Sequence, residues 1–241
     1  MLVRRPRLVK KNPRANEYGN APAYSIAEAS RYLGVPSSTV RAWVIGQTRS
    51  RPVLCPADPG PPPRLSFINL IEAHVLAAIR RKYNVPLQRI RKAVRYLCEV
   101  FRSRHPLAEH RFETDGVDLF VQQAGITVSA SGGGQAVIRE IVERYFKRVD
   151  WDRKGGGPLR FYPYTREIDE GIPPGADEPR LVVIDPSMGG GQPIIAGRGI
   201  LVSVIGRRYK AGETIPDLAR DYCCSTEEIN EAIRFQFAPA A

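Results

Sequence analysis

The sequence is poor in the residues that build metal centres and disulfide frameworks. It holds four Cys and three His in 241 residues, and no Cys-x-x-Cys spacing. Cys223 and Cys224 are adjacent, an arrangement that suits neither an ordinary disulfide nor a four-ligand metal cage. The three His lack metal-ligand spacing to the Cys. We therefore expect no metal ion, no cofactor, and a reducing, cytoplasmic environment.

Long apolar segments are missing as well. No run of about 18 apolar residues occurs, so no membrane-spanning helix and no membrane partner are expected. The first 25 residues are basic and lack an apolar core, which argues against a secretory signal.

Catalytic groupings are equally scarce. Glu113, Asp115 and Asp118 are close in sequence, but they surround an Asp-Gly turn that favours Asp for conformational reasons. The glycine-rich segment 189–199 lacks the Lys-Ser/Thr pair and the directly following helix of a nucleotide-binding loop. No candidate nucleophile has a base nearby, so an enzyme, such as a nuclease acting on bound DNA, is disfavoured.

Positive charge is abundant, and its distribution is uneven. Residues 1–111 contain 21 Lys/Arg and 6 Asp/Glu, whereas residues 112–241 contain 15 Lys/Arg and 19 Asp/Glu. The net charge of +11 thus combines +15 in the first part with −4 in the second. The basic part suits the phosphate backbone of nucleic acid, which releases counterions when a protein binds. The mildly acidic part favours a different partner.

Residues 24–45, YSIAEASRYLGVPSSTVRAWVI, predict a helix-turn-helix. Ser25 and Glu28 have the spacing of a capping box at the first helix start. Gly34 and Pro36 end that helix, because Gly suits a C-cap and Pro lacks a donor. The second helix begins near Ser37, and the alternative is an ordinary helical hairpin with a polar rim. Its outward side carries the side chains expected to contact bases in the major groove: Ser37, Ser38, Thr39 and Arg41.

The flanks of this motif are basic and rich in proline. Residues 1–23 are expected to be an irregular arm, either solvated or in contact with phosphates or the minor groove. Residues 46–65 contain five prolines after Pro52 and cannot be helical. Two short extended arms around a Pro/Gly tip would form a wing, and the alternative is a flexible loop. The wing arginines would contact the DNA backbone: Arg49, Arg51 and Arg64.

Two longer helices are expected after the wing. Ser66 can cap the first, which has a buried apolar stripe and ends near Tyr83. Pro86 suits the first position of the second, whose apolar positions run from Leu87 to Phe101. The opposite face is basic, and it is either solvated, close to DNA or packed on a dimer mate: Arg89, Arg91, Lys92, Arg95 and Arg102.

Residues 24–98 resemble the winged-helix DNA-binding domain of MerR-type regulators. The resemblance rests on YSIAEASRYLGVPSSTVRAW and on LIEAHVLAAIRRKYNVPLQRIRKAV. The wing departs from the family pattern because it is longer and richer in proline. MerR-type regulators continue into a dimerisation coiled coil and an effector domain, and no such coiled coil is evident in this sequence.

Residues 105–180 predict a small central α+β unit, a hairpin plus a helix. The segment 111–121 alternates apolar and polar residues around Asp115-Gly116, which predicts a β-hairpin. A strand at 124–128, a flexible joint at 129–134 and a helix at 135–147 are expected next. Strands at 151–152 and 159–164 would follow, joined across Gly155-Gly156-Gly157.

The last part of the chain predicts a strand followed by a pair of capped helices. The strand is expected at 181–184. Thr214 and Asp217 can begin one helix, and Ser225 and Glu228 have capping-box spacing at the start of the next.

The last segment also contains a spaced pattern of Pro, Gly and apolar residues. The residues of this pattern are Asp185, Pro186, Pro193, Ile195, Gly197, Ile200, Gly212, Tyr222, Glu227 and Ile229. The pattern resembles a small domain common in bacterial toxin–antitoxin operons, except that Arg198 and Gly199 stand where that family usually has Thr-Arg. A MerR-like winged helix in front of this domain resembles one subgroup of VapB-type antitoxins.

The resemblance implies two macromolecular partners. One is a PIN-like ribonuclease toxin, neutralised by direct binding, and the other is operator DNA, bound as a homodimer on a palindrome to repress the operon. Because PIN-like toxins gather carboxylates around a divalent metal, an inhibiting segment offers Arg beside apolar anchors. Arg234, Phe235 and Phe237 fit that chemistry, although a frayed helix end explains them equally well.

The predicted fold class is α+β with four parts. These are a basic flexible arm at 1–23, a MerR-like winged helix-turn-helix at 24–104, the central unit at 105–180, and a carboxyl-terminal strand plus helix-turn-helix-like domain at 181–241. The predicted function is a non-enzymatic antitoxin and transcriptional repressor. The alternative is a MerR-like regulator that responds to a ligand and has no toxin partner.

Overall fold

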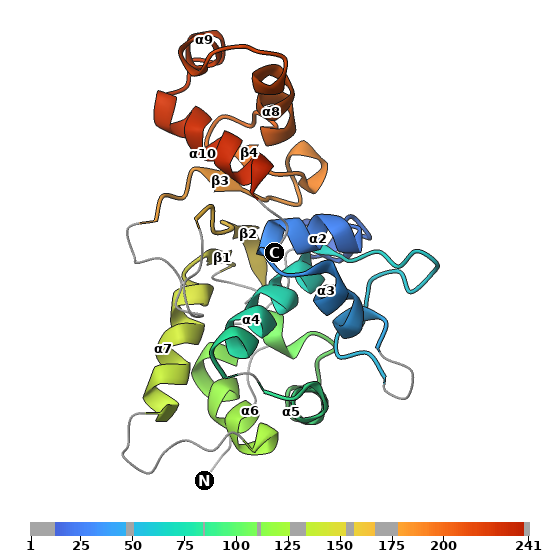
Figure 1. Ribbon diagram of the computed structural model, residues 1–241. Coiled ribbons are helices and arrows are strands. Elements are labelled where there is room, and N and C mark those ends of the chain that lie inside the picture. Colours follow the sequence, from blue (N-terminus) through green and yellow to red (C-terminus); the bar gives the residue numbers. More distant parts are fainter. Residues whose placement is uncertain are drawn as a thin grey trace.

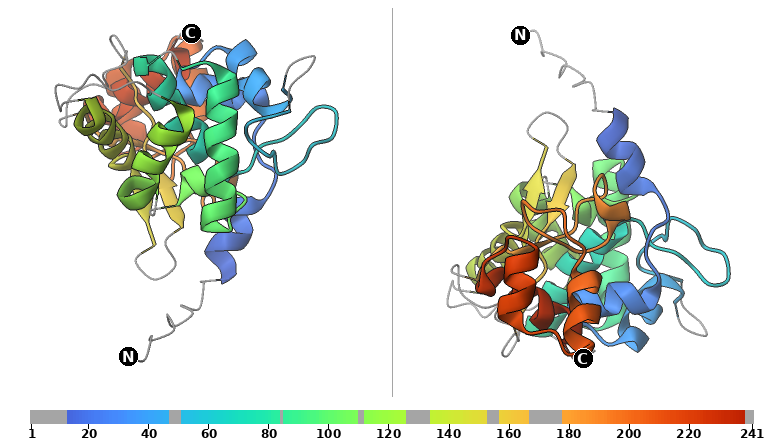
Figure 2. Two further views of the ribbon diagram at one scale, coloured as in Figure 1. Left: turned by 90° about the horizontal axis from the view of Figure 1, so that it is seen from below. Right: turned by 90° about the horizontal axis from the view of Figure 1, so that it is seen from above.

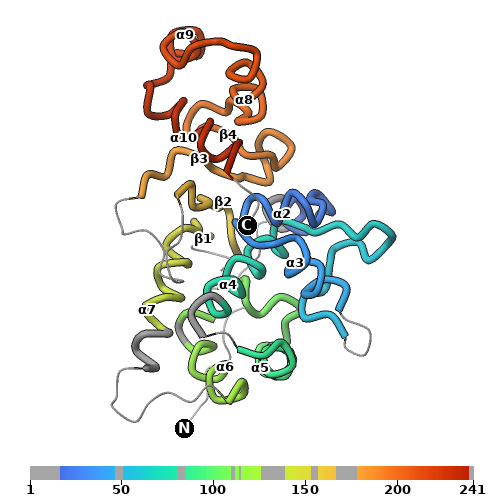
Figure 3. The backbone as a smooth tube through the Cα atoms, in the orientation of Figure 1, coloured from blue at the N-terminus to red at the C-terminus, as the bar shows by residue number. Residues whose placement is uncertain are grey.

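The computed structural model describes residues 13–46, 51–83, 85–109, 112–125, 134–152, 157–166 and 178–238. Within these ranges the fold is α+β, as expected: helices dominate, and two small antiparallel sheets lie among them (Figure 1). The carboxyl-terminal helices form a group at one end of the molecule, with α2 beneath them (Figure 3).

The helix-turn-helix prediction is confirmed. Helix α2 spans Ile26–Leu33 and α3 spans Ser37–Val44. The Ser25 hydroxyl accepts the Glu28 N–H at 3.2 Å, and the Glu28 carboxylate accepts the Ser25 N–H at 2.8 Å. Gly34 closes α2 in the left-handed conformation, with φ 57°. Both helix ends are therefore set by local hydrogen bonds, as the sequence pattern indicates.

The segment before this motif requires a correction. Helix α1 spans Pro13–Asn20, within the part expected to be irregular. It packs on α4, where Gly19 lies against Ile68. Tertiary contact explains this helix, since a helix this short is marginal in isolation. Residues 1–12 of the predicted arm lie outside the described residues.

Helix α4, Phe67–Tyr83, is the central helix of the fold. It contacts α1, α2 and the later helix α7. Its start is capped reciprocally, because Ser66 N–H donates to Asn69 Oδ1 at 3.1 Å and Asn69 N–H donates to Ser66 Oγ at 3.2 Å. Helix α5 spans Leu87–Phe101, and Pro86 stands just before it rather than at its first position.

The β-hairpin predicted at 111–121 is wrong. A π-helical turn spans Phe112–Gly116, and helix α6 spans Val117–Ala124. The buried positions of α6 have helical spacing, and the helix packs on α5. Gly116 does not form the predicted hairpin turn. It allows the Phe112 and Phe101 rings to lie close to the backbone, because an added Cβ would be 2.7 Å from Phe112 and 3.1 Å from Phe101. Ala124 ends α6, so the strand predicted from 124 does not begin there, and 126–133 lie outside the described residues.

The helix and the strand pair predicted for the second half of the central unit are present, but the strands predicted at 151–152 and 159–164 have other bounds. Helix α7 spans Gly134–Phe146, and strands β1, Val149–Trp151, and β2, Pro158–Phe161, pair antiparallel. Residues 153–156, between the strands, are not described. An isolated bridge joins β2 to the last part of the chain, with Phe161 N–H donating to Ile184 O at 2.9 Å and Ile184 N–H to Phe161 O at 2.8 Å.

The carboxyl-terminal part contains more elements than predicted. Strands β3, Val182–Val183, and β4, Ile194–Ile195, pair antiparallel. Helices α8, Val202–Lys210, α9, Ile215–Asp221, and α10, Thr226–Phe237, follow. The caps predicted for α9 and α10 are present, whereas α8 and β4 were not predicted. The glycine-rich segment forms a 3-10 turn, Gly189–Gly191, that leads to β4 and not to a helix.

One hydrophobic core runs through the three units predicted after the arm, at 24–104, 105–180 and 181–241. One cluster of buried side chains includes Trp43 and Leu70, then Phe120 and Phe161, and finally Ile229. The boundaries at 104 and 180 remain predictions for independently folding units, while the described side chains pack across both.

Candidate nucleic-acid interface

Helix α3 has one buried and one exposed side. Val40, Trp43 and Val44 are buried, with Trp43 1% exposed. Ser37, Ser38 and Arg41 are exposed, and Thr39 is partly exposed. The structure thus brings the four residues predicted to contact bases onto the outer side of one helix.

The amino-terminal end of α3 favours an anion. Pro36 precedes the helix, no side chain caps its first turn, and that turn contains no acidic residue. The backbone N–H groups at a helix start carry partial positive charge, which attracts phosphate groups.

The predicted wing is present as residues 51–65, which we call the wing loop. Its arms are held by one bridge, with Asp58 N–H donating to Arg64 O at 3.0 Å and Arg64 N–H to Asp58 O at 2.9 Å. Its other end is tied to α3, because the N–H groups of Val53 and Leu54 donate to Trp43 O. Figures 1 and 2 show the tip extending away from the helices beside α3.

The predicted wing arginines have different surroundings. Arg51 is exposed, and its carbonyl accepts a hydrogen bond from Arg91 Nε at 2.5 Å. Arg64 is exposed, and its Nη2 donates to Ala23 O at 2.6 Å. Arg49 lies outside the described residues. The Arg91 contact ties the wing loop to α5.

Helix α5 adds positive charge next to the wing loop. Arg89, Lys92 and Arg95 are exposed along its outer side, and Arg91 is half-buried. Arg89 Nη1 donates to Gly125 O at 3.3 Å, so this side chain also contacts the end of α6. The basic face predicted for this helix therefore exists and is accessible.

The three residues predicted to bind a toxin do not share one surface. Arg234 is exposed and paired with the buried carboxylate of Glu231. Phe235 is only 3% exposed, because its ring stacks on Tyr32 of α2 with centroids 5.8 Å apart. Phe237 is 49% exposed. Residues two apart on a helix point in different directions, so the sequence spacing of Phe235 and Phe237 already argued against a shared surface.

Sequence reasoning missed Tyr209, the residue beside Phe237. Tyr209 lies in the last turn of α8, is 40% exposed, and has its ring centroid 6.3 Å from that of Phe237. Arg234 and Phe237 of α10 and Tyr209 of α8 are accessible side chains near one end of this helix pair. We call these three residues the α8–α10 patch.

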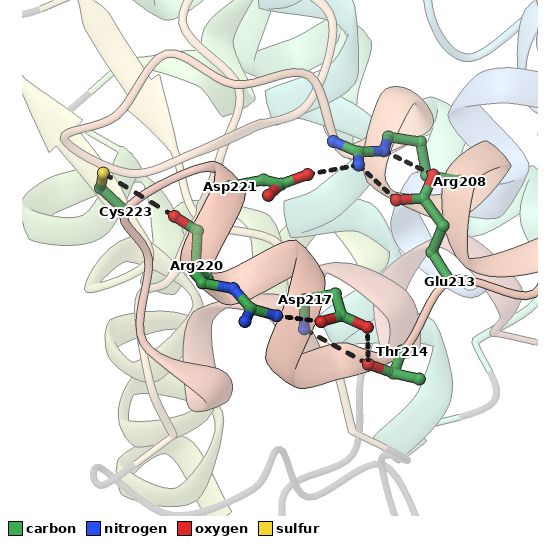
Figure 4. Close-up of polar contacts among 7 residues, drawn as sticks. All are labelled: Arg208, Glu213, Thr214, Asp217, Arg220, Asp221 and Cys223. Carbon is green, nitrogen blue, oxygen red and sulfur yellow. Dashed lines mark hydrogen bonds and ion pairs between the residues drawn. The ribbon is translucent and has the colours of Figure 1, made fainter.

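Other polar residues of the carboxyl-terminal part stabilise the fold. Figure 4 shows Arg208 donating to Glu213 and Asp221, which joins the end of α8 to both ends of α9. These hydrogen bonds raise the pKa of the Arg208 guanidinium above its ordinary value. Asp185 is buried, which opposes its ionisation, but hydrogen bonds from Ser187 and Arg160 hold its pKa below the usual range.

Two features are absent from the described part of the chain. Within it, no group of three or more His, Cys, Asp and Glu side chains is arranged to hold a metal ion. No helix there has both the length and the hydropathy needed to span a bilayer.

Comparison with known families assigns both ends of the chain. Residues 22–94 match a family described as "Putative DNA-binding HTH domain", and residues 182–235 match "Protein of unknown function (DUF433)". The "Putative antitoxin VapB45" of Mycobacterium tuberculosis is 32% identical over 240 residues, covering 89% of this chain and 93% of that protein. This chain belongs to the VapB45 family.

A second sequence and a crystal structure from the same organism also match this chain over most of their length. The "Uncharacterized protein Rv2308" is 28% identical over 227 residues, covering 88% of this chain and 89% of that protein. The crystal structure of Rv2018 is 29% identical with a TM-score of 0.65, covering 88% of this chain and 98% of that one. The VapB45-family fold therefore includes the carboxyl-terminal domain as well as the helix-turn-helix.

Proposed function

We propose that this protein is a non-enzymatic antitoxin that binds operator DNA and represses its own operon. The main support for this proposal is the surface of α3, where Ser37, Ser38 and Arg41 are exposed and the opposite side is buried. An exposed polar helix beside a basic wing loop has the shape and charge that enter a major groove.

The proposed contacts divide into two kinds. Ser37, Ser38, Thr39 and Arg41 contact base edges, since they lie on the outer side of α3. Arg49, Arg51 and Arg64 contact the sugar-phosphate backbone and hold the protein in register. In a MerR-like arrangement, two copies of the chain bind a palindrome, each placing one α3 in the groove.

The second proposed partner is a PIN-like ribonuclease toxin. The name of the VapB45 relative supports a toxin partner, and the toxin class comes from the resemblance of the domain pair to VapB-type antitoxins. We assign the contact to the α8–α10 patch, where Arg234 supplies positive charge and Tyr209 and Phe237 supply exposed aromatic surface. Phe235 is not part of this contact because its ring is buried on α2.

The test uses the neighbouring reading frame and the upstream DNA. The purified full chain should co-purify with the neighbouring gene product and inhibit its ribonuclease activity. It should also protect a palindromic segment upstream of the operon in a footprint. A chain that protects no upstream DNA would contradict the repressor, and one that neither binds nor inhibits the neighbouring product would contradict the antitoxin.

Point variants of the α8–α10 patch test the contact more sharply than truncation. A truncation from residue 234 would also remove Phe235 from the core. Tyr209→Ala with Phe237→Ala should abolish inhibition while leaving DNA binding unchanged. Inhibition at the level of the unaltered chain would remove the patch from the toxin interface.

A further inference from the structure

Helix α2, the first helix of the helix-turn-helix, packs directly on the carboxyl-terminal domain. The Tyr32 ring stacks on Phe235 of α10 at an interplanar angle of 28°, and both side chains are buried. The Tyr32 hydroxyl also donates to Gln192 Oε1 at 3.1 Å. One side chain of α2 therefore contacts two separate segments of that domain.

Tyr24 makes a second connection from the residue just before the α2 cap. Its backbone pairs with Leu65 at the end of the wing loop, with N–O distances of 2.9 and 2.8 Å. Its buried hydroxyl donates to Gly191 O at 2.8 Å. Burial raises the pKa of this phenol, so the hydroxyl stays protonated and remains a donor. Tyr24 thus joins the wing loop, the start of α2 and the carboxyl-terminal domain.

The geometry of Gly191 fits this contact. Its φ is +75°, and an added Cβ would lie 2.8 Å from the Tyr24 hydroxyl oxygen. A larger residue would be strained in conformation and would also collide with Tyr24. The glycine-rich segment, which lacks the features of a phosphate-binding loop, therefore allows close approach to the helix-turn-helix. We call Gly191, Gln192 and Phe235 the α2 contact site.

We infer that the α2 contact site positions the helix-turn-helix for DNA binding, with Tyr24 and Tyr32 as the positioning residues. Helix α2 packs on α3 and α4, so its orientation helps to determine where α3 presents Ser37, Ser38 and Arg41. The carboxyl-terminal domain is then part of the DNA-binding unit, in addition to its role toward a second partner. This inference rests on the proposed DNA binding.

The experiment measures operator and random-sequence DNA affinity of full-length variants by fluorescence anisotropy. Phe235→Ala removes the ring beneath Tyr32, and Gly191→Ala pushes against the Tyr24 hydroxyl. Each should lower operator affinity about tenfold, as is typical for coupling through packed side chains, while random-sequence binding changes much less. Phe235→Tyr keeps the stacked ring and should restore operator affinity.

Leu218→Ala is the matched control. Leu218 is fully buried in α9, which lies on the side of the carboxyl-terminal domain away from α2 (Figure 1). The Leu218→Ala variant should lower the melting temperature about as much as Phe235→Ala, yet leave operator affinity unchanged. Tyr24→Phe removes only the Gly191 hydrogen bond, so it keeps the test valid if Phe235→Ala does not fold.

A readout without DNA separates the inference from the proposed function. Amide exchange of α2 in the free protein should accelerate in Phe235→Ala and stay unchanged in Leu218→Ala. Unchanged exchange and operator affinity in Phe235→Ala, Gly191→Ala and Tyr24→Phe would overturn the inference, as would an equal loss of operator affinity in Leu218→Ala. An unaltered chain that does not prefer any upstream DNA would overturn the proposed function instead.

Discussion

The molecule contains two helix pairs of similar local construction and different surface. The pair α2–α3 begins with the Ser25–Glu28 capping box, and the pair α9–α10 contains the Ser225–Glu228 capping box at the start of α10. The second helix of the first pair has no acidic residue and no side-chain cap in its first turn. By contrast, the first turn of α10 is capped by the Ser225 side chain and contains two acidic residues, Glu227 and Glu228.

This difference gives the starts of α3 and α10 different local charge. Acidic side chains at a helix start repel phosphate, whereas the uncapped start of α3 attracts it. The first pair also has the wing loop and the basic face of α5 beside it, whereas the charges of α9 are paired, Asp217 with Arg220 and Asp221 with Arg208 of α8. This difference supports the proposal that α2–α3 binds DNA and that the region of α8 and α10 binds protein.

The largest expected difference between the two surfaces is in the salt dependence of their binding affinities. If six or more phosphates are contacted, operator affinity should fall about a thousandfold between roughly 50 and 200 mM salt, because bound counterions are released. Binding of the toxin to the α8–α10 patch, which includes two aromatic rings, should change far less. Anisotropy titrations over a salt series measure both, and a flat response for the operator would contradict phosphate contact by the first pair.

Arg41→Ala should give the next largest effect. If Arg41 makes a bidentate base contact, its loss should weaken operator binding by about 1–3 kcal/mol and random-sequence binding by less. Arg220→Ala is the control in the second pair, because Arg220 is exposed on α9 and paired with Asp217. Competition titrations measure the difference. Equal losses on operator and random DNA would remove Arg41 from the base-contacting set.

Loss of either capping serine should lower protein stability equally, but only one loss should affect operator binding. Ser25→Ala and Ser225→Ala should each lower the free energy of unfolding by about 1 kcal/mol, since each removes a helix cap. Only Ser25→Ala should also weaken operator binding, because Ser25 begins α2. Urea denaturation and anisotropy measure the two quantities. Equal operator losses in both variants would mean that the start of α10 matters for DNA binding as much as the start of α2.

Acid should have the smallest effect, through the carboxylates of the same two caps. The hydrogen bond from Ser225 N–H lowers the pKa of Glu228, and at Glu28 hydrogen bonds from Ser25 outweigh burial to lower its pKa also. A carboxylate whose pKa is lower in the folded than in the unfolded state stabilises the fold at pH values above its unfolded-state pKa. This stabilisation is lost as the pH falls through the folded-state pKa.

Denaturation at a series of pH values tests the acid effect. The free energy of unfolding should decline between about pH 5 and pH 3, and the decline should be shallower in Glu28→Gln and Glu228→Gln. Glutamine can still accept the cap hydrogen bond, so both variants should fold. An identical pH dependence in either variant and the unaltered chain would exclude that carboxylate as a source of acid sensitivity.

The sequence patterns succeeded where neighbouring residues decide the structure. Ser25, Glu28 and Gly34 predicted both ends of α2, because caps and left-handed glycines act within a few residues. The failure at 112–124 has an equally physical cause. Val117, Leu119 and Val121 fit an alternating pattern, whereas Val117, Phe120 and Val121 fit a helical one, and the choice depended on packing against α5.

The sequence by itself determined the uneven charge, the two capped helix pairs and the polar outer side of α3. Tertiary structure alone decided that Phe235 lies under Tyr32, that Gly191 accepts the Tyr24 hydroxyl, and that Tyr209 joins Phe237. The physical reason is the range of the interactions. Caps and charges belong to a few consecutive residues, whereas burial depends on which distant segments meet, and a local pattern contains no information about that partner.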